Sequence, residues 1–250
     1  MKEKIRVTNL RKSFGDKTIL DGLSFHVNES EVLCIIGQSG TGKSVTLKLL
    51  VGMLIPDAGS IFVDDENYVE ATISRRREIE SKYGILFQGA ALFDSMNIYD
   101  NVAFGMRRRG ASEDEIAEAV PRLLESVGLK NVEDKRVSEI SGGMQKRVGL
   151  ARALALKPEI MLYDEPTTGV DPITGGAVDR LIVGMRDIYG ITSVVVTHDM
   201  TSACRIADRI IMLYKGRELI AGTPNDVMNS EDPIVRQFTE GRADGPIKIM

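Results

Sequence analysis

The chain has 250 residues, of which 43% are apolar and 27% are charged, as is usual for a soluble globular protein. Its net charge of −4 gives no reason to expect nucleic acid as a partner, and its two cysteines form no disulfide framework, which fits a reducing, cytosolic setting. No apolar run approaches the roughly 18–20 residues that span a bilayer, so any membrane crossing is expected to fall to another chain.

The N-terminal region is expected to form an antiparallel sheet edge. Apolar residues alternate with polar ones around Ile5 and again around Phe25, a period typical of half-buried strands. Phe14 lies between them in the turn-like polar stretch Lys12–Asp16, where an aromatic ring has little core to join. Two interpretations stay open: the ring is a flat platform for a nucleotide base, or it belongs to a minor apolar cluster.

A glycine-rich segment follows the apolar run Val32–Ile36 and precedes the helix-like run Val45–Val51. Strand, loop and helix are the context in which G-x-x-x-x-G-K-[ST] binds phosphate, because glycines let successive N–H groups turn inward and the helix start adds free donors. Lys43 would reach the β- and γ-phosphates, and the Ser44 hydroxyl would hold Mg²⁺. The residues expected to bind the nucleoside triphosphate here are Gly37, Gln38, Ser39, Gly40, Thr41, Gly42, Lys43, Ser44 and Thr46.

A polar amide ends the next predicted strand. Tyr83–Phe87 reads as a strand that leads to Gln88, and ligands bind at the carboxyl ends of strands in parallel α/β sheets. Gln88 is therefore a candidate ligand of Mg²⁺ or of a water. From Gly89 to about Leu156 the pattern becomes helical, with a capping box at Ser112 and Glu115, which predicts a helical insertion.

Ser141, Gly142 and Gly143 stand at the start of a second helix in this insertion. Bare N–H donors, a hydroxyl and the positive end of the helix dipole would suit an anion. The alternative is a simple serine cap behind a flexible loop.

Two adjacent carboxylates, Asp164 and Glu165, end the apolar strand Ile160–Tyr163. Carboxylates at a buried strand's tip are costly unless they bind a cation or take part in chemistry. Asp164 would be the Mg²⁺ partner and Glu165 would orient and polarise the attacking water; the alternative is a solvated acidic turn. His198 ends the strand Val194–Thr197 and would lie where the γ-phosphate sits.

Two further predictions concern the start of a short helix and the C-terminal segment. Ser74 is expected to cap a short helix that carries Arg75–Arg77. The segment from Ser230 to Met250 has no clear period and is expected to be an irregular C-terminal extension.

Together these motifs resemble the ATP-binding subunit of ABC transporters over nearly the whole chain. A Walker A loop alone occurs in many NTPases, whereas the ordered set is specific to this family. In family terms the matches are Gly37–Ser44 for Walker A, Gln88 for the Q-loop, Ser141–Gly143 for the signature motif, Asp164 and Glu165 for Walker B, Asp171 for the D-loop, His198 for the H-loop and Phe14 for the aromatic A-loop.

The resemblance implies a single ABC ATP-binding domain over residues 1–250: an α/β, RecA-like P-loop NTPase core with an antiparallel β edge and a helical subdomain at about 89–156. It implies a head-to-tail homodimer that holds ATP and Mg²⁺ between its copies. Ser141 and Gly143 of one copy would face the γ-phosphate held by Lys43 of the other. Separately from the resemblance, Val235 and Phe238 are apolar residues on an otherwise polar tail, about 230–250, which we therefore expect to dock on its dimer mate.

The roles implied for single residues follow from the same match. Phe14, Ser141, Gly142, Gly143 and Asp171 join the phosphate-loop residues as nucleotide contacts. The implied catalytic residues are Lys43, Gln88, Glu165 and His198, and the implied metal ligands are Ser44, Gln88 and Asp164.

A departure from the family pattern suggests a subfamily. Met144 stands where many relatives have Gln, so the motif reads SGGMQ. The stretch from Phe87 to Arg107, the run from Ser141 to Leu154 and the tail from Val235 to Ile247 are similar to the ATPase of the Mla phospholipid-transport system. That similarity implies a separate membrane-spanning permease, an Mce-type lipid-binding protein, no nucleic acid, and a peripheral position on the cytoplasmic face of the bacterial inner membrane.

Two other functions stay open. The same motor could serve a small-solute importer of the amino-acid type, because such subunits also lack membrane segments. A soluble ABC ATPase acting on ribosomes or DNA is less favoured, because the chain has one Walker A motif and no long heptad run.

Overall fold

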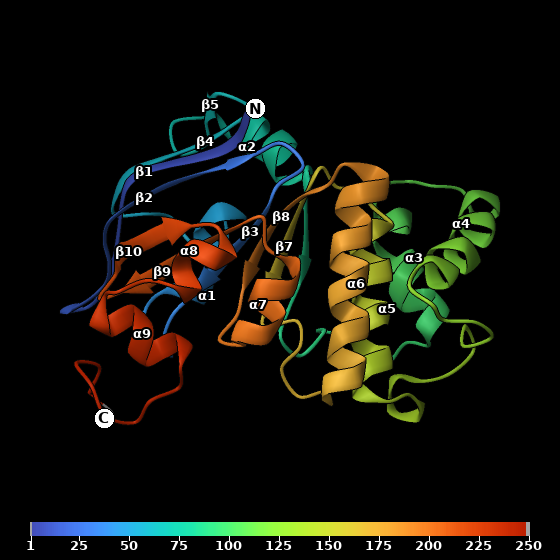
Figure 1. Ribbon diagram of the computed structural model, residues 1–250. Helices are drawn as coiled ribbons and strands as arrows, with labels where there is room; N and C mark the ends of the chain where they lie inside the picture. The colour runs from blue at the N-terminus through green and yellow to red at the C-terminus, as the bar shows by residue number, and fades with distance from the viewer. Residues whose placement is uncertain (1, 249–250) are drawn as a thin grey trace.

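Two β-sheets and a set of helices make up residues 2–248, the range that this computed structural model describes (Figure 1). The smaller sheet is antiparallel and has the strand order β2-β1-β4-β5. Its strands are β1 (Glu3–Phe14), β2 (Lys17–Asn28), β4 (Ala58–Val63) and β5 (Glu66–Asn67).

The hairpin of β1 and β2 confirms the expected antiparallel edge, with Ile5 paired to Val27. The stretch Lys12–Asp16 is not a turn throughout, because β1 continues to Phe14. Asp57 stabilises this extended end: it accepts hydrogen bonds from the Lys12 ammonium at 2.7 Å and from the Ser13 backbone N–H at 2.7 Å. The turn is therefore limited to two residues.

The larger sheet has the strand order β10-β9-β3-β8-β7-β6. All of its strands are parallel except β10, which is antiparallel to β9. Parallel strands point their carboxyl ends to one edge, so the loops that follow neighbouring strands meet there. The strands are β3 (Val32–Ile36), β6 (Tyr83–Leu86), β7 (Ile160–Asp164), β8 (Thr192–Val196), β9 (Arg209–Tyr214) and β10 (Arg217–Gly222).

Both faces of this sheet are covered, which explains its continuously apolar strands. In β3, Cys34 and its alternate neighbours pack into one core cluster with the helices, while Leu33 and Ile35 pack into a second cluster with α1 and the antiparallel sheet. The rigid sheet between the two clusters fixes the positions from which the functional loops start.

In Figure 1, α3, α4, α5 and α6 group together on one side of the molecule, and α5 packs directly against β6 of the large sheet. The expected inserted helices are confirmed, and Ser112 and Glu115 form the predicted capping box of α4. No helix within residues 2–248 has both the length and the apolar character to cross a bilayer. The helices are α1 (Lys43–Leu50), α2 (Ile73–Glu80), α3 (Ile98–Arg108), α4 (Glu113–Ser126), the 3₁₀ turn η1 (Val137–Glu139), α5 (Gly142–Leu154), α6 (Pro172–Tyr189), α7 (Met200–Ile206), α8 (Pro224–Met228) and α9 (Pro233–Thr239).

Ser74 does not cap the helix that carries Arg75–Arg77. Helix α2 begins one residue before Ser74, and Thr72 is its N-cap, with a side chain that accepts a hydrogen bond from the Arg75 backbone at 3.3 Å. Thr72 takes the cap because it lies directly before the first helical residue, while Ser74 already lies inside the first turn.

The tail is not simply irregular, because it contains α9. Val235 is fully buried in the chain's own core, and Phe238 packs against the same cluster, so the expectation that Val235 is left for a second copy is wrong. The Gln237 side chain then holds the backbone of Ile247, accepting from its N–H at 2.6 Å and donating to its carbonyl at 3.0 Å. A helix of two turns is too short to show a period in the sequence.

Candidate active site

Four of the predicted motifs follow neighbouring strands of the large sheet. The phosphate loop, Gly37–Ser44, follows β3, and His198 follows β8. Asp164 and Glu165 lie at the end of β7, and Gln88 comes after β6. Because these strands are parallel and adjacent in the order β3-β8-β7-β6, the four motifs share one edge of the sheet.

The phosphate loop has the backbone shape that its glycines predict. Gly37, Gly40 and Gly42 have φ angles of 146°, 81° and 103°. At Gly42 a Cβ atom would also lie 2.6 Å from Cδ2 of Leu20, so both conformation and space require glycine. No side chain caps the first turn of α1, which leaves its N–H donors available to an anion.

Lys43 lies in the mouth of this loop and is 7% exposed. Its ammonium donates to the carbonyl oxygens of Gly37 at 2.7 Å and Gln38 at 3.1 Å. Burial lowers the pKa of Lys43, while the negative charges of Glu165 and Asp164 act to raise it. The loop therefore holds a cation next to the N–H groups that would receive phosphate.

Ser44 and Asp164 come together from two different elements. The Ser44 hydroxyl, at the start of α1, donates to Oδ1 of Asp164 at 2.9 Å. A hydroxyl beside a carboxylate provides the oxygen ligands that Mg²⁺ prefers. Thr46, by contrast, is fully buried, and its hydroxyl donates to the carbonyl of Gly42 at 2.9 Å, so it supports the loop from behind.

Glu165 has strained backbone geometry and a well-defined side chain. Its φ of 51° is left-handed, which is uncommon for a residue with a side chain. Its Oε2 lies 2.8 Å from Nδ1 of His198 and accepts a hydrogen bond from the Thr168 hydroxyl at 3.1 Å. Glu165 is 9% exposed while the His198 side chain is 58% exposed. The pair thus presents a fixed carboxylate and an open imidazole at the sheet edge, a geometry suited to orienting a water.

Gln88 is exposed and lies two residues beyond the end of β6. Its backbone carbonyl accepts a hydrogen bond from Lys146, which also donates to the carbonyl of Glu165 at 3.3 Å. The sequence analysis missed Lys146. The sequence carries no signal for it, because Lys146 lies between the polar residues Gln145 and Arg147, as a residue on an exposed helix face would.

The second group of predicted residues lies at two neighbouring helix starts. Ser141 is the N-cap of α5, and Asp171 caps α6 by accepting from the backbone N–H groups of Ile173 and Thr174 at 3.0 Å each. A Cβ atom on Gly143 would lie 2.3 Å from Thr174, so the two helix starts pack closely. Within residues 2–248, no hydrogen bond or ion pair joins Ser141, Gly142, Gly143 or Asp171 to the phosphate loop.

Phe14 ends β1 with its side chain open to solvent, at 49% exposure. The Lys12 ammonium lies 5.5 Å from the centre of its ring. Further along the same hairpin, Thr18 and Ile19 line a cavity of about 580 Å³ together with residues 38–41 of the phosphate loop. The hairpin therefore lies beside the loop, and Phe14 has an exposed ring at its tip.

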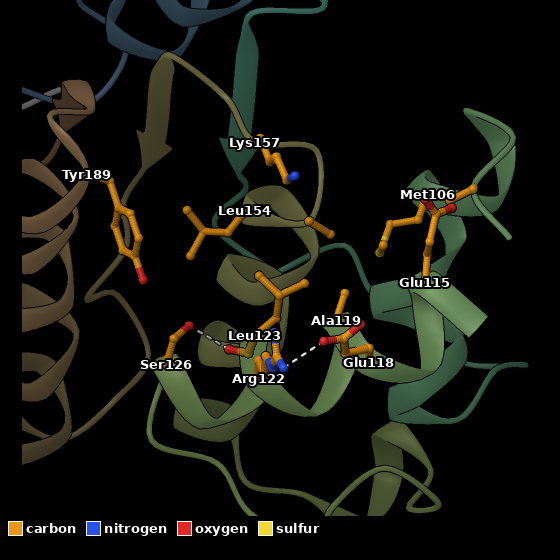
Figure 2. Close-up of a pocket in the computed structure, with 12 residues that line it drawn as sticks. Met106, Glu115, Glu118, Ala119, Arg122, Leu123, Ser126, Leu154, Lys157 and Tyr189 are labelled. Carbon is orange, nitrogen blue, oxygen red and sulfur yellow. Dashed lines mark hydrogen bonds and ion pairs between the residues drawn. The ribbon is translucent and has the colours of Figure 1, made fainter. Parts of the chain in front are cut away.

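A separate groove lies between α4 and the ends of α3, α5 and α6 (Figure 2). It measures about 520 Å³ and is lined by apolar groups such as Leu123 and Leu154, with the ion pair of Arg122 and Glu118 on α4. None of the predicted site residues lines this groove. This groove is therefore separate from the residues that meet at the sheet edge.

Comparison with known proteins gives a family and several relatives. Residues 20–168 match the family model described as ABC transporter. The chain is 42% identical to the probable ribonucleotide transport ATP-binding protein mkl of Mycobacterium tuberculosis over 97% of this chain and 68% of that protein. It is 41% identical to chloroplastic TRIGALACTOSYLDIACYLGLYCEROL 3 of Arabidopsis thaliana over 98% of this chain and 75% of that protein. It is 38% identical to the intermembrane phospholipid transport system ATP-binding protein MlaF of Haemophilus influenzae over 98% of this chain and 93% of that protein.

Solved structures are similar over most of the chain. The protein cbiO1 of Clostridium perfringens, part of the ABC transporter complex cbiONQ, matches with a TM-score of 0.85 and 28% identity, covering 97% of this chain and 96% of that one. The dimeric ATP-binding cassette MJ0796, bound to ADP and phosphate, matches with a TM-score of 0.80 and 29% identity, covering 88% of this chain and 98% of that one.

Proposed function

Because this chain belongs to the ABC transporter family and is an ATPase, we propose that it is the motor subunit of a transporter that moves phospholipid between membranes of the bacterial envelope. The main support for ATP hydrolysis is that Lys43, the Ser44–Asp164 pair and the Glu165–His198 pair lie at one edge of the sheet. The cargo is supported by similarity over nearly the whole chain to MlaF.

Hydrolysis would use groups that this chain already orients. The phosphate loop receives the phosphates of ATP, and the Lys43 ammonium stabilises charge on the γ-phosphate. Glu165 accepts a hydrogen bond from the attacking water and directs it, while His198 contacts the transferred phosphate from beside Glu165. Mg²⁺, when bound, would neutralise the β- and γ-phosphates, and Ser44, Asp164 and Gln88 would hold it.

The helix starts at Ser141 and Asp171 need a second copy in this scheme. The N–H donors and the hydroxyl at Ser141 suit an anion but are not bonded to the phosphate loop of the same chain. In a head-to-tail homodimer Ser141 and Gly143 would face the γ-phosphate bound by Lys43 of the partner copy, with Asp171 at the neighbouring helix start. The dimeric state of the similar cassette MJ0796 supports this assignment.

Transport would require other chains. We assign to this ATPase a separate membrane-spanning permease and an Mce-type lipid-binding protein, with the ATPase peripheral to the cytoplasmic face of the inner membrane and without nucleic acid. A second candidate is a small-solute importer, because the name of the Mycobacterium relative specifies ribonucleotide transport. ATP hydrolysis would be identical in both transporters, so the partner proteins distinguish the two candidate functions.

The test is to purify the tagged chain from detergent-solubilised native membranes and to identify what accompanies it, with the untagged strain as control. The proposal predicts a permease and an Mce-domain protein that carries phospholipid. A permease with a solute-binding protein would replace the cargo and keep the motor. Recovery of ribosomes or DNA, with nothing from membranes, would contradict the transporter role.

A further inference from the structure

A buried lysine outside the predicted motifs forms hydrogen bonds to two of them. Lys146 lies on α5 and is 5% exposed. A buried ammonium is costly unless it is paired or fully hydrogen-bonded. Within residues 2–248 Lys146 forms no ion pair; its donors go instead to the backbone carbonyls of Gln88 and Glu165, the latter at 3.3 Å.

Both acceptors belong to loops of the candidate active site. Gln88 follows β6, and Glu165 follows the adjacent strand β7. Glu165 has left-handed backbone geometry, with φ at 51°, and such strain persists only where the surroundings hold it. Burial lowers the pKa of Lys146, and the carboxylates of Glu165 and Asp164 act in the opposite direction. Lys146 therefore holds the peptide that carries the carboxylate as well as lying near its charge.

A second cation of α5 offers a comparison. The Arg152 guanidinium donates to the carbonyls of Ala91 at 2.7 Å and Ala90 at 2.8 Å, in the loop that begins at Gln88. Arg152 thus holds the same loop as Lys146, but within residues 2–248 it forms no hydrogen bond or ion pair with Glu165. Substituting Arg152 therefore tests the effect of losing hydrogen bonds to the loop alone. Substituting Lys146 also removes the hydrogen bond to the backbone of Glu165.

We propose that Lys146 is a positioning residue for ATP hydrolysis. Its ammonium fixes the backbone of Glu165 so that the carboxylate keeps its orientation toward His198 and the attacking water. Because Ser141 caps the helix that carries Lys146, the same ammonium also connects the Gln88 loop and Glu165 to that helix. This inference rests on the role proposed for Glu165.

The test measures kcat and KM for Mg-ATP in the full chain with three substitutions. Lys146→Met keeps the length but removes the charge and the donors, and it is expected to lower kcat by about 10–100-fold with KM changed less than threefold, because misplacement of about 1 Å costs that much. Lys146→Arg keeps charge and donors and should return kcat to within fivefold of wild type. Arg152→Met, the matched control, should change kcat less than threefold.

Several outcomes would overturn the inference. A kcat for Lys146→Met close to wild type, an equal loss in Arg152→Met, or a failure of Lys146→Arg to restore kcat would each do so. If thermal unfolding shows that Lys146→Met does not fold, Lys146→Leu, which also lacks the charge and the donors, takes its place with the same criteria. Glu165→Gln is measured in parallel: if that variant is inactive while Lys146→Met turns over normally, only the role of Lys146 fails. If Glu165→Gln turns over normally, the role of Glu165 and this inference both fail.

Discussion

The phosphate loop and the loop after β6 contain the same unusual backbone geometry but reach it in opposite ways. The phosphate loop places glycine at its left-handed positions, among them Gly40 and Gly42. The loop after β6 places alanine there, at Ala90 and Ala91, with φ angles of 58° and 49°. Left-handed backbone geometry causes no steric strain in glycine, but it raises the conformational free energy of an alanine by about 1–2 kcal/mol.

The difference shows what holds each loop. The phosphate loop is shaped by its own residues, including the Lys43 ammonium that donates back to its carbonyls. The alanine loop is held from outside, by Arg152 and Lys146 of α5. Gly149 of α5 allows the close approach, since a Cβ there would lie 2.9 Å from Leu86. The shape of the first loop is therefore determined by its own residues, and the shape of the second depends on the position of α5.

The largest expected effect is on the phosphate loop. Gly42→Ala places a Cβ 2.6 Å from Leu20 at a φ of 103°, so the loop must deform. We expect the affinity for ATP, measured by calorimetry, to fall at least 100-fold, on the order of 3 kcal/mol. Gly110→Ala is the control, because Gly110 has a φ of 82° and no atom within 4 Å of its added Cβ. Equal ATP affinity in the two variants would contradict the account of the loop.

The next largest effect is the loss of ATP affinity when the charge of the loop is removed but its backbone shape is kept. Lys43→Ala removes the ammonium and leaves the glycines intact, so ATP affinity should fall about 10–100-fold, the loss of one charge-assisted contact to phosphate. Lys48→Ala changes an exposed lysine of the same helix and should bind ATP as wild type does. A similar affinity for both variants in calorimetry would remove Lys43 from the nucleotide site.

The smallest expected effect is a gain in stability rather than a loss of function. Ala91 is exposed, so Ala91→Gly loses little packing and relieves left-handed strain. The free energy of unfolding, from urea denaturation, should rise by up to about 1 kcal/mol. This is the strain energy that is relieved, reduced by the larger conformational entropy that glycine loses on folding. Ala117→Gly, at an exposed position of α4, should lower it by about 0.5–1 kcal/mol. A fall in both variants would mean that Ala91 is not strained.

The sequence predicted what local patterns encode. Strand β3, the glycine loop and α1 are contiguous, and the carboxyl ends of β7 and β8 follow from apolar runs, so Asp164, Glu165 and His198 could be placed at strand ends. The sequence does not contain strand order, and the contact of Ser44 with Asp164 joins residues 120 positions apart.

Other features escaped because their signals were short or non-local. Helix α9 spans two turns, and burial of Val235 depends on the core of the whole chain. Lys146 resembles an ordinary helix-surface residue until α5 is placed on the loops after β6 and β7.

The most direct measurement of the central claim is ATP binding and turnover in Glu165→Gln beside wild type. The substitution keeps the shape of the side chain and removes the carboxylate that lies 2.8 Å from His198. We expect hydrolysis to fall at least 100-fold, ATP affinity to be kept, and a dimer to persist in ATP and Mg²⁺ by size-exclusion chromatography. Turnover near the wild-type rate would contradict the assignment of Glu165 and, with it, the proposed mechanism.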